Sequence, residues 1–357
     1  MSTAIIPAFT ERNIPVVFSA DETYAPYLGV TLQSLVEHAS SEFNYDILIL
    51  DGGILPEMKR TLASILPSGS QHFSLRYIDM QKYREELDKL FVDRHLSSAT
   101  YYRLILSSLL EDYDSVLYLD CDLLVMDDPA LLYRCDLEGY LVAGVKEIAT
   151  YWIDPSWHQE WHQSIVEQGV ENPLHSFNAG VLLMNLKAFR EIKLERRLLD
   201  LARNNRFIQH DQDVLNIACE NRWQLLPGEW NYQYHQCAPY EFSEETSRQE
   251  QTIMDEPASY RIVHYIRDQK PWSHPDKPLA PLWWEYARRN PFYAVLRAGA
   301  PARGVLRGRW FVHGIAAGVA GLCAKVSPPS LRRRFSRKAE YSRKAARSLR
   351  AFLAITR

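Results

Sequence analysis

The stretch from Ser115 to Val125, SVLYLDCDLLV, decides the fold because a largely apolar run leads straight into two carboxylates one residue apart. An apolar run bounded by charge is typical of a buried strand. Side chains alternate along a strand, so Asp120 and Asp122 point the same way if extended geometry persists at the strand end. Two hard oxygen ligands suit Mg²⁺ or Mn²⁺, which usually complete their shells with water and substrate phosphates. We therefore expect a metal–diphosphate site here; the alternative is a pair of turn aspartates that accept from local backbone donors.

Strands and helices alternate along the chain on both sides of this stretch. Such alternation predicts an α/β fold with a mostly parallel, doubly wound sheet, in which ligands sit beyond the carboxyl ends of the strands. Asp21 and the Asp120–Asp122 turn both follow such ends. The expected strands are 14–20, 45–50, 72–78, 115–119, 141–145, 181–185 and 260–264. The first expected helix begins near Tyr24. The other expected helices cover 56–66, 81–90, 97–110, 129–133, 194–204, 211–220 and 281–290.

Composition separates an acidic body from a basic tail. The net charge is −3, yet residues 301–357 hold fourteen Lys or Arg and a single acidic residue, Glu340. The five cysteines form no C-x-x-C pair, which argues against a disulfide framework or a structural zinc site and favours a reducing compartment. Residues 1–13 lack the pattern of a signal peptide, and we expect no membrane-spanning helix.

Polar residues interrupt the apolar strands or begin helices at several places. Taken singly, each is better explained as a surface ion-pair partner, a turn residue or a structural histidine. Their ordered combination is far rarer by chance. The set comprises Asp21, Arg103, Asp120, Asp122, Asn178, Asp211, Gln212, His264 and Lys270.

The sequence resembles glycosyltransferase family 8, which holds bacterial lipopolysaccharide and lipooligosaccharide galactosyl- and glucosyltransferases and glycogenin. The resemblance covers residues 14–272 and follows the family's order of motifs. These are VFSAD at 17–21, YRL at 102–104, VLYLDCD at 116–122, FNAGVLLMNL at 177–186, DQD at 211–213, and HY at 264–265 with KPW at 270–272. It implies one Rossmann-like nucleotide-sugar transferase domain of the GT-A type, which we place over 14–300. We expect an N-terminal extension at 1–13 and, from the charge distribution, a basic helical tail at 301–357.

The resemblance implies a metal and a nucleotide site. Asp120, Asp122 and His264 would bind Mn²⁺, with Mg²⁺ as the alternative ion, and the metal would bridge the diphosphate of a UDP-sugar. Such an ion acts as a Lewis acid on the departing UDP. Lys270 would add a point charge on the phosphates. The uridine pocket would be lined by Ala20, Asp21 and Thr23.

The resemblance also assigns residues to the donor sugar. Asn178, Ala179 and Asp211 would hold its hydroxyls, Arg103 would lie over the sugar and phosphate, and Gln212 would lie near the anomeric carbon. The implied catalytic residues are thus Gln212, Asp211 and Arg103. The implied cofactor-binding set further includes Cys121, although alternation along the strand points its side chain to the opposite face, into the sheet packing.

The implied reaction is α-glycosyl transfer with retention of configuration. Retaining hydrolases use a carboxylate nucleophile, whereas Gln212 is a poor one. Double displacement and front-side attack, in which the departing phosphate accepts the proton of the acceptor, both stay open.

Three positions depart from the family pattern. Thr23 replaces the more usual Asn, which weakens the case for its uridine contact. Glu147 stands where an Asp is expected after strand 141–145, so its sugar contact is in doubt. Arg267 replaces a small residue, often Gly, before Lys270; an arginine there offers its own pairing with phosphate.

The segment from Tyr151 to His162 is unusually aromatic. Its rings suit stacking on an acceptor sugar, but Trp157 and Trp161 at i and i+4 equally fit a buried helix face. His158 and His162 share that spacing, yet no adjacent Glu or third ligand completes a zinc site.

The tail has two parts. Residues 311–326 are apolar but too short and too rich in Gly and Ala for a membrane span. Residues 331–357 interleave basic with apolar side chains, a pattern of segments that lie on anionic membranes, where each Lys or Arg contributes about 1 kcal/mol. A disordered tail and nucleic-acid binding are the alternatives. The resemblance favours a membrane carrying a lipid-linked acceptor, and no nucleic acid.

We therefore expect a cytoplasmic enzyme, peripheral on the inner face of the cell membrane. It would move glucose or galactose from UDP to an oligosaccharide or lipid-linked glycan, such as a lipopolysaccharide core. A sugar nucleotidyltransferase would require a Gly-rich, basic loop after the first strand, and Ser19-Ala20-Asp21 is not that. The remaining alternative is a catalytically inactive glycan-binding or scaffold protein of the same fold.

Overall fold

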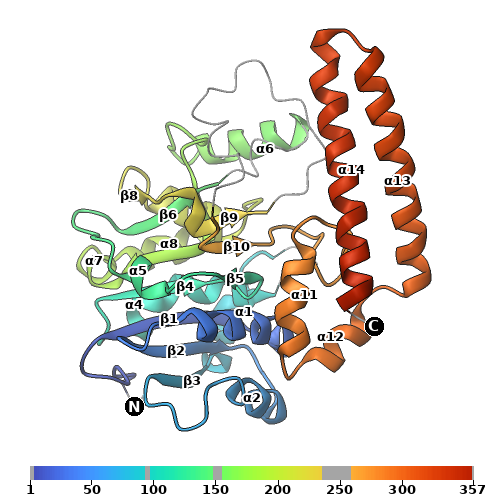
Figure 1. Cartoon of the computed structure of the whole chain (residues 1–357). Helices are drawn as coiled ribbons and strands as arrows, with labels where there is room; N and C mark the ends of the chain where they lie inside the picture. The colour runs from blue at the N-terminus through green and yellow to red at the C-terminus, as the bar shows by residue number, and fades with distance from the viewer. Residues whose placement is uncertain (1–3, 93–96, 148–154, 235–258, 356–357) are drawn as a thin grey trace. The chain divides into compact units, whose positions relative to one another are not determined.

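A computed structural model describes residues 4–92, 97–147, 155–234 and 259–355 of the 357-residue chain (Figure 1). The chain forms two compact units. The first comprises Met1–Tyr232 with Glu256–Val263, and the second comprises Gln233–Asp255 with His264–Arg357. Each unit is described by itself.

A seven-stranded sheet is the centre of the first unit, with the strand order β3-β2-β1-β4-β7-β6-β8. Neighbouring strands are parallel except at β7, which runs antiparallel to both β4 and β6. The expected α/β class with a mostly parallel sheet is confirmed. The strands are β1 (Asn13–Ala20), β2 (Asn44–Asp51), β3 (Phe73–Asp79), β4 (Ser115–Leu119), β6 (Val142–Lys146), β7 (Phe177–Asn185) and β8 (Trp223–Leu225).

Helices pack on this sheet and bury it, which is why the central strands have nearly continuous apolar runs. In β2 every residue from Tyr45 to Asp51 is buried. The helices of this unit are α1 (Ala25–His38), α2 (Pro56–Ala63), α3 (Arg84–Leu87), α4 (Leu106–Leu109), α5 (Pro129–Tyr133), α6 (Pro155–Val166), α7 (Leu186–Glu191), α8 (Leu194–Asn204) and α9 (Asp211–Ala218), with 3₁₀ helices η1 (Gln81–Tyr83), η2 (Ser98–Ile105) and η4 (Gly228–Asn231).

The chain leaves the large sheet at Asp120. Extended geometry does not persist there: the backbone bends at Cys121 and Asp122, and β5 (Leu123–Val125) joins a second sheet of order β5-β10-β9. Its other strands are β10 (Ile262–His264) and β9 (Tyr232–Gln233). The condition on which we expected the two aspartates to share a face is therefore not met, and the bend sets their directions instead.

A second difference lies at Arg103. We expected a helix over 97–110, and the structure has the 3₁₀ helix η2 followed by the short helix α4. The hydroxyl of Ser97 caps η2 by accepting a hydrogen bond from the Ala99 N–H at 3.2 Å. Arg103 lies on η2 and is buried.

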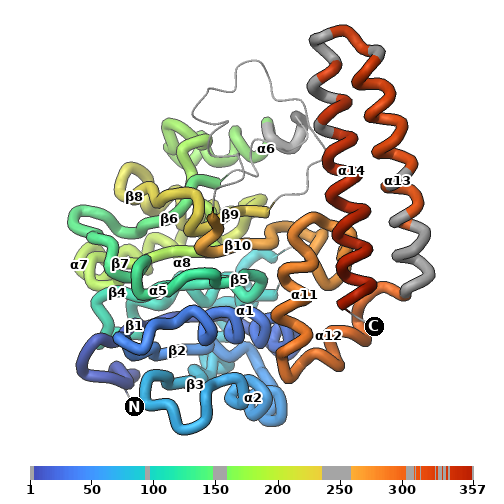
Figure 2. The backbone as a smooth tube through the Cα atoms, in the orientation of Figure 1, coloured from blue at the N-terminus to red at the C-terminus, as the bar shows by residue number. Residues whose placement is uncertain are grey.

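The second unit is helical at its C-terminal end, with α11 (Ala280–Arg289), α12 (Tyr293–Gly299), α13 (Arg303–Val326) and α14 (Pro329–Ile355). Helices α13 and α14 lie side by side as a hairpin, coloured orange to red in Figure 2. Within the described ranges, no helix has the length and hydropathy that crossing a bilayer requires.

Apolar side chains of α14 hold the hairpin to α11. Leu349 and Phe352 are fully buried, and the Phe352 ring meets the Trp284 ring at 4.9 Å between centroids. The sequence pattern assigned these residues to a membrane, but the structure uses them for packing within the unit. On α13, Arg309 pairs with the buried Asp276 at 2.9 Å and His313 lies 3.5 Å from the same carboxylate.

Candidate active site

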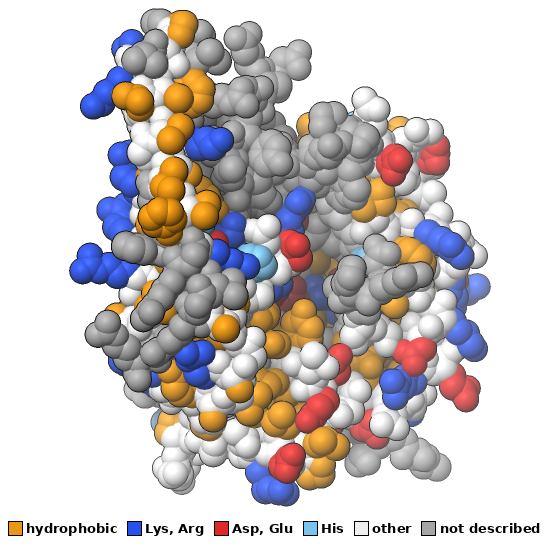
Figure 3. All heavy atoms as spheres, turned by 90° about the vertical axis from the view of Figure 1, so that its right-hand side faces the viewer, with side chains coloured by type: hydrophobic (Ala, Val, Ile, Leu, Met, Phe, Trp, Pro, Cys, Tyr) orange, Lys and Arg blue, Asp and Glu red, His pale blue; other side chains and the backbone are white. Residues whose placement is uncertain are grey.

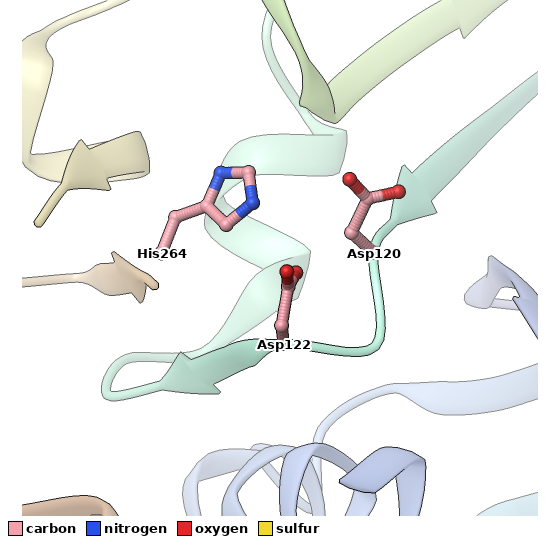
Figure 4. Close-up of side chains that lie close together, drawn as sticks. All are labelled: Asp120, Asp122 and His264. Atoms are coloured by element: carbon pink, nitrogen blue, oxygen red, sulfur yellow. The ribbon is translucent and has the colours of Figure 1, made fainter. Parts of the chain in front are cut away.

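Two aspartates and one histidine converge at the bend between β4 and β5. One ligand atom each from Asp120, Asp122 and His264 lies within 4.8 Å of the others, and Figure 4 shows the three side chains turned toward a common point. His264 ends strand β10, which belongs to the same small sheet as β5. Segments that are far apart in sequence are thus brought together by strand pairing.

Helix α1 fixes the backbone that carries the aspartates. The buried hydroxyl of Thr31 donates to the carbonyls of Cys121 at 2.8 Å and Leu123 at 2.9 Å. The N–H of Asp120 donates to the Gly180 carbonyl at 2.9 Å, which ties the bend to β7 as well. These anchors fix the backbone from which the two carboxylates extend.

The donor set fits a divalent ion. Carboxylate oxygens with one imidazole suit Mn²⁺, and Mg²⁺ accepts the same oxygens. His264 is 4% exposed, so its ring is buried. Its carbonyl accepts a hydrogen bond from the Tyr234 N–H at 2.7 Å, which fixes its backbone. The three residues therefore form a candidate metal centre.

Arg103 links this centre to helix α9. Its Nη2 donates to Asp120 at 2.8 Å, its Nε lies 2.9 Å from Asp211, and its guanidinium lies 4.1 Å from the centroid of the Tyr118 ring. Burial would lower the pKa of Arg103, but Asp120 and Asp211 outweigh it and hold that pKa above its ordinary value. The guanidinium thus remains charged although it is 5% exposed.

The carboxylates on α9 differ in their surroundings. Burial raises the pKa of Asp211, and Arg103 and the Thr100 hydroxyl oppose that rise. Burial raises the pKa of Asp213 to about 7, although it accepts hydrogen bonds from the Trp161 indole at 2.9 Å and the Gln209 N–H at 2.8 Å. Asp211 therefore belongs to the charged cluster, whereas Asp213 braces α9 against α6.

The predicted donor-sugar residues also lie together. Asn178 and Ala179 are on β7, and Gln212, at the start of α9, accepts a hydrogen bond from the Ala179 N–H at 2.9 Å. The Ala179 carbonyl accepts from Arg103 at 2.5 Å. Glu147, directly after β6, accepts from the amides of both Asn178 and Gln212.

The predicted uridine residues follow the end of β1. Ala20 is fully buried, Asp21 accepts from the Tyr24 N–H at 3.0 Å, and Thr23 is exposed on the turn. Tyr24 is a residue that sequence reasoning missed. Burial, followed by the negative charge of Asp122, raises the pKa of Tyr24. The available signal was an aromatic residue directly before Ala25, the first residue of α1.

The segment after His264 carries the predicted phosphate residue. The Lys270 ammonium donates to the Tyr265 carbonyl at 2.6 Å. Arg267, which departs from the family pattern, has a φ of 63°. This left-handed conformation is the one that glycine adopts most easily, which explains why a small residue is the usual choice at that position.

Two further interpretations gain from the structure. The Cys121 side chain is buried and its Sγ donates to the Ser19 carbonyl at 3.0 Å, which agrees with its expected place in the sheet packing. Trp161 is 1% exposed, so for this residue the buried helix face is the better interpretation. Residues 151–154, and the side chains of Trp157 and His158, lie outside the described part of the chain.

Comparisons with known proteins give the same assignment. A family model described as glycosyl transferase family 8 matches residues 15–275. Glycosyltransferase GlyF of Streptococcus pneumoniae is 29% identical over 274 residues, which cover 76% of this chain and 60% of that protein. Lipopolysaccharide 1,2-glucosyltransferase of Escherichia coli is 24% identical over 330 residues, which cover 88% and 92%.

Solved structures agree in fold. An active-site mutant of LgtC is similar with a TM-score of 0.63 and 26% identity, over 77% of this chain and 95% of that one. The bifunctional glycosyltransferase WbbM is similar with a TM-score of 0.71 and 25% identity, over 83% and 53%. Because the family model spans more than half of the sequence and the motifs meet at one site, this chain belongs to glycosyltransferase family 8.

Proposed function

We propose that this protein is a metal-dependent, retaining transferase that moves glucose or galactose from UDP to a bacterial surface glycan. The convergence of Asp120, Asp122 and His264 beside the Arg103–Asp211 pair carries the proposal. The acceptor we propose is a lipopolysaccharide or lipooligosaccharide core. Support comes from the E. coli relative, which is named for a lipopolysaccharide glucosyl transfer, and from the LgtC structure that holds donor and acceptor sugar analogues.

The proposed roles follow the chemistry of each side chain. Asp120, Asp122 and His264 would hold Mn²⁺, which when bound supplies a Lewis acid to the diphosphate leaving group. Lys270 would add a positive charge at the phosphates. At the other end of the donor, Ala20, Asp21 and Thr23 would bind the uridine.

The sugar would lie between β7 and the start of α9. Arg103 there has its fork fixed by two carboxylates, so it would orient the sugar and phosphate without rearrangement. Asn178, Ala179 and Asp211 would bind sugar hydroxyls, with Gln212 near the anomeric carbon. The amide of Gln212 is hydrogen bonded at both ends, which favours front-side attack over nucleophilic attack by Gln212. Trapping a glycosyl adduct on Gln212 or Asp211 would contradict this preference.

A donor screen tests the activity. The full-length protein is incubated with a panel of nucleotide sugars, with and without Mn²⁺, and release of UDP is measured. We expect turnover with UDP-glucose or UDP-galactose that depends on the metal. No release from any UDP-sugar would favour the inactive scaffold instead.

We also propose that the tail meets the anionic inner face of the cell membrane, through α13 rather than α14. Five large apolar side chains of α13 are each more than half exposed: Phe311, Val312, Ile315, Val319 and Leu322. Their spacing puts them on one side of the helix. Figure 3 shows apolar side chains along the hairpin, bordered by Lys and Arg in blue. Exposed arginines on α14 are Arg332, Arg343, Arg347 and Arg350.

The charge of the tail favours anionic lipids over a second copy of the chain at the exposed apolar side of α13. A second copy of a segment with fourteen basic residues and one acidic residue would be repelled, whereas anionic lipids would be attracted. In a vesicle sedimentation assay, serine at Phe311, Ile315 and Leu322 should reduce binding to phosphatidylglycerol vesicles at least tenfold. A matched control replaces three exposed leucines of the first unit, Leu55, Leu131 and Leu225. Unchanged binding, or a dimer by light scattering that the substitutions dissolve, would refute the membrane face.

A further inference from the structure

Glu147 lies directly after β6, and its side chain is buried, with 3% exposed. Its Oε2 accepts a hydrogen bond from Asn178 Nδ2 at 2.8 Å and another from Gln212 Nε2 at 2.9 Å. Its own N–H donates to the Ser176 carbonyl at 2.8 Å, which fixes the backbone from which the side chain extends. One carboxylate oxygen therefore joins an amide on β7 to an amide on α9.

The chemistry of these partners leaves each amide a single orientation. An ionised carboxylate only accepts hydrogen bonds, so both amides must turn their nitrogen to Glu147. Backbone N–H groups only donate, so the atoms that face them must be the amide oxygens. The Ala179 N–H donates to the side-chain oxygen of Gln212 at 2.9 Å, and the Gly180 N–H donates to that of Asn178 at 3.0 Å. The assignment of oxygen and nitrogen in both side chains thus follows from their partners.

The surrounding contacts make this arrangement rigid. Asn216 on α9 donates to the Phe177 carbonyl at 2.9 Å and accepts from the Phe177 N–H at 2.8 Å, which locks α9 to β7. Asn231 donates to the oxygen of Asn178 at 2.8 Å. Glu147 supplies the acceptor for the nitrogen of both amides, and Gln209 supplies a second acceptor for that of Gln212.

We propose that Glu147 is a positioning residue that sets the orientation of the Gln212 and Asn178 amides toward the donor sugar. The inference rests on the proposed function, which gives those amides their sugar contacts. The resemblance expects an Asp at this position. Glutamate has one more methylene, which here lets a single oxygen reach both amides. Without that acceptor the NH₂ group of Asn178 loses its bond to Glu147 and that of Gln212 keeps only its bond to Gln209, so both amides are held less firmly in their working orientation.

Three substitutions separate the roles of charge, reach and acceptor. Glu147→Ala removes the acceptor, Glu147→Asp withdraws it by one methylene, and Glu147→Gln keeps an acceptor oxygen of the same reach without the charge. Glu138→Ala is the matched control, because Glu138 is exposed in the loop before β6. For each full-length variant, binding of UDP and of the preferred UDP-sugar is measured by calorimetry, and kcat and KM are measured by UDP release.

We expect Glu147→Ala to lower kcat by about 10- to 100-fold, because misplacing a positioning group by about 1 Å has effects of that size. Affinity for the UDP-sugar should fall, while affinity for UDP should stay within about twofold, because the proposed roles give these amides contacts with the sugar and none with the nucleotide. Glu147→Gln should restore most of kcat, and Glu147→Asp should lie between. A kcat within twofold of wild type for Glu147→Ala, or a Gln variant as impaired as the Ala variant, would overturn the proposal.

A second measurement does not depend on turnover. In ¹⁵N-edited NMR spectra, the side-chain NH₂ signals of Gln212 and Asn178 should move in Glu147→Ala and return toward their wild-type positions in Glu147→Gln. Unmoved signals would overturn the positioning role whatever the substrate. If the Glu147 variants show these shifts but the wild-type protein binds no UDP-sugar, the proposed function is refuted and the positioning role of Glu147 stands.

Discussion

Replacing Arg103 by Met tests whether the charged cluster is organised around this one guanidinium. The substitution keeps most of the side-chain volume and removes the partner that lies 2.8 Å from Asp120 and 2.9 Å from Asp211. In the variant the charge of Asp120 can still be solvated, because this residue is partly exposed. The charge of Asp211 cannot, because Asp211 is only 5% exposed. Breaking a buried pair by removing one partner costs about 3 to 5 kcal/mol of unfolding free energy. At about 2 to 4 °C per kcal/mol for a unit of this size, Tm should fall by about 6 to 20 °C.

The pH dependence gives the sharper test. Burial already raises the pKa of Asp211, and loss of Arg103 removes the largest opposing influence, so the native pKa rises further. A carboxyl with a native pKa above its unfolded value, about 3.9, binds more protons when folded, so its contribution to stability falls as pH rises. The deficit of the variant should therefore be largest at pH 8 and smaller at pH 5, where the carboxyl is closer to protonation.

Urea unfolding followed by circular dichroism at both pH values measures this. Adding Asp211→Asn to Arg103→Met should recover part of the lost stability, because the unpaired charge is gone. Arg134→Met is the control: Arg134 is exposed, its guanidinium lies 5.9 Å from the Phe43 ring, and its loss should cost under about 1 kcal/mol. A loss below 1 kcal/mol for Arg103→Met, or a deficit equal at pH 5 and pH 8, would refute the reasoning.

Other substitutions test neighbouring parts of the site. Asp120→Asn or Asp122→Asn should abolish Mn²⁺-dependent UDP release while the far-UV circular dichroism spectrum stays unchanged. Turnover above one tenth of the wild-type value would show that the substituted aspartate is not a metal ligand. Cys121→Ser should keep activity within about threefold, because a hydroxyl can make the same donation to the Ser19 carbonyl, and a larger loss would contradict the assigned packing. Because burial raises the pKa of Asp213 to about 7, stability should fall by about 3 kcal/mol as pH rises from 4 to 7, and Asp213→Asn should flatten that profile in urea titrations.

Periodicity located most elements because their local pattern and their packing agree. The helix at Leu194–Asn204 was expected over the same residues, since its charged and apolar positions alternate with helical spacing. The strand before Asp120 was likewise expected where β4 lies, because both of its faces are buried. Sequence reasoning works for such elements because the same residues that favour the local conformation also fill the core.

The bend at Asp120–Asp122 could not be predicted in this way. It depends on hydrogen bonds from Thr31, which lies on α1 some ninety residues earlier in the chain. Nothing in the spacing of apolar residues signals a change from one sheet to another within five positions. The convergence with His264 was expected only from the family resemblance, because strand pairing between β5 and β10 leaves no local trace in the sequence.

The tail shows a different limit. An amphipathic helix has the same pattern whether its apolar side meets lipid or protein, so residues such as Phe352 could not be assigned from the sequence. The structure resolves this for α14, where Phe352 packs on Trp284, and leaves the exposed apolar side on α13. The sequence did not indicate this exposed side, because the many Gly and Ala residues in 311–326 obscure the helical spacing of the large apolar residues.

Backbone strain next to the site is the part furthest from sequence reasoning. His210 has φ 51° and ψ −119° immediately before Asp211, and Arg267 has φ 63° shortly before Lys270. Each such conformation costs a non-glycine residue about 1 to 3 kcal/mol and persists only where its neighbours determine it. For His210 those neighbours include Asp211, held by Arg103, and Gln212, held by Ala179 and Glu147. Because Asn216 locks α9 to β7 and Ala179 holds Gln212 without help from Glu147, φ at His210 should stay positive in a crystal structure of Glu147→Ala. A relaxed φ in that variant would show that the Glu147 contact with Gln212 is needed to hold this backbone.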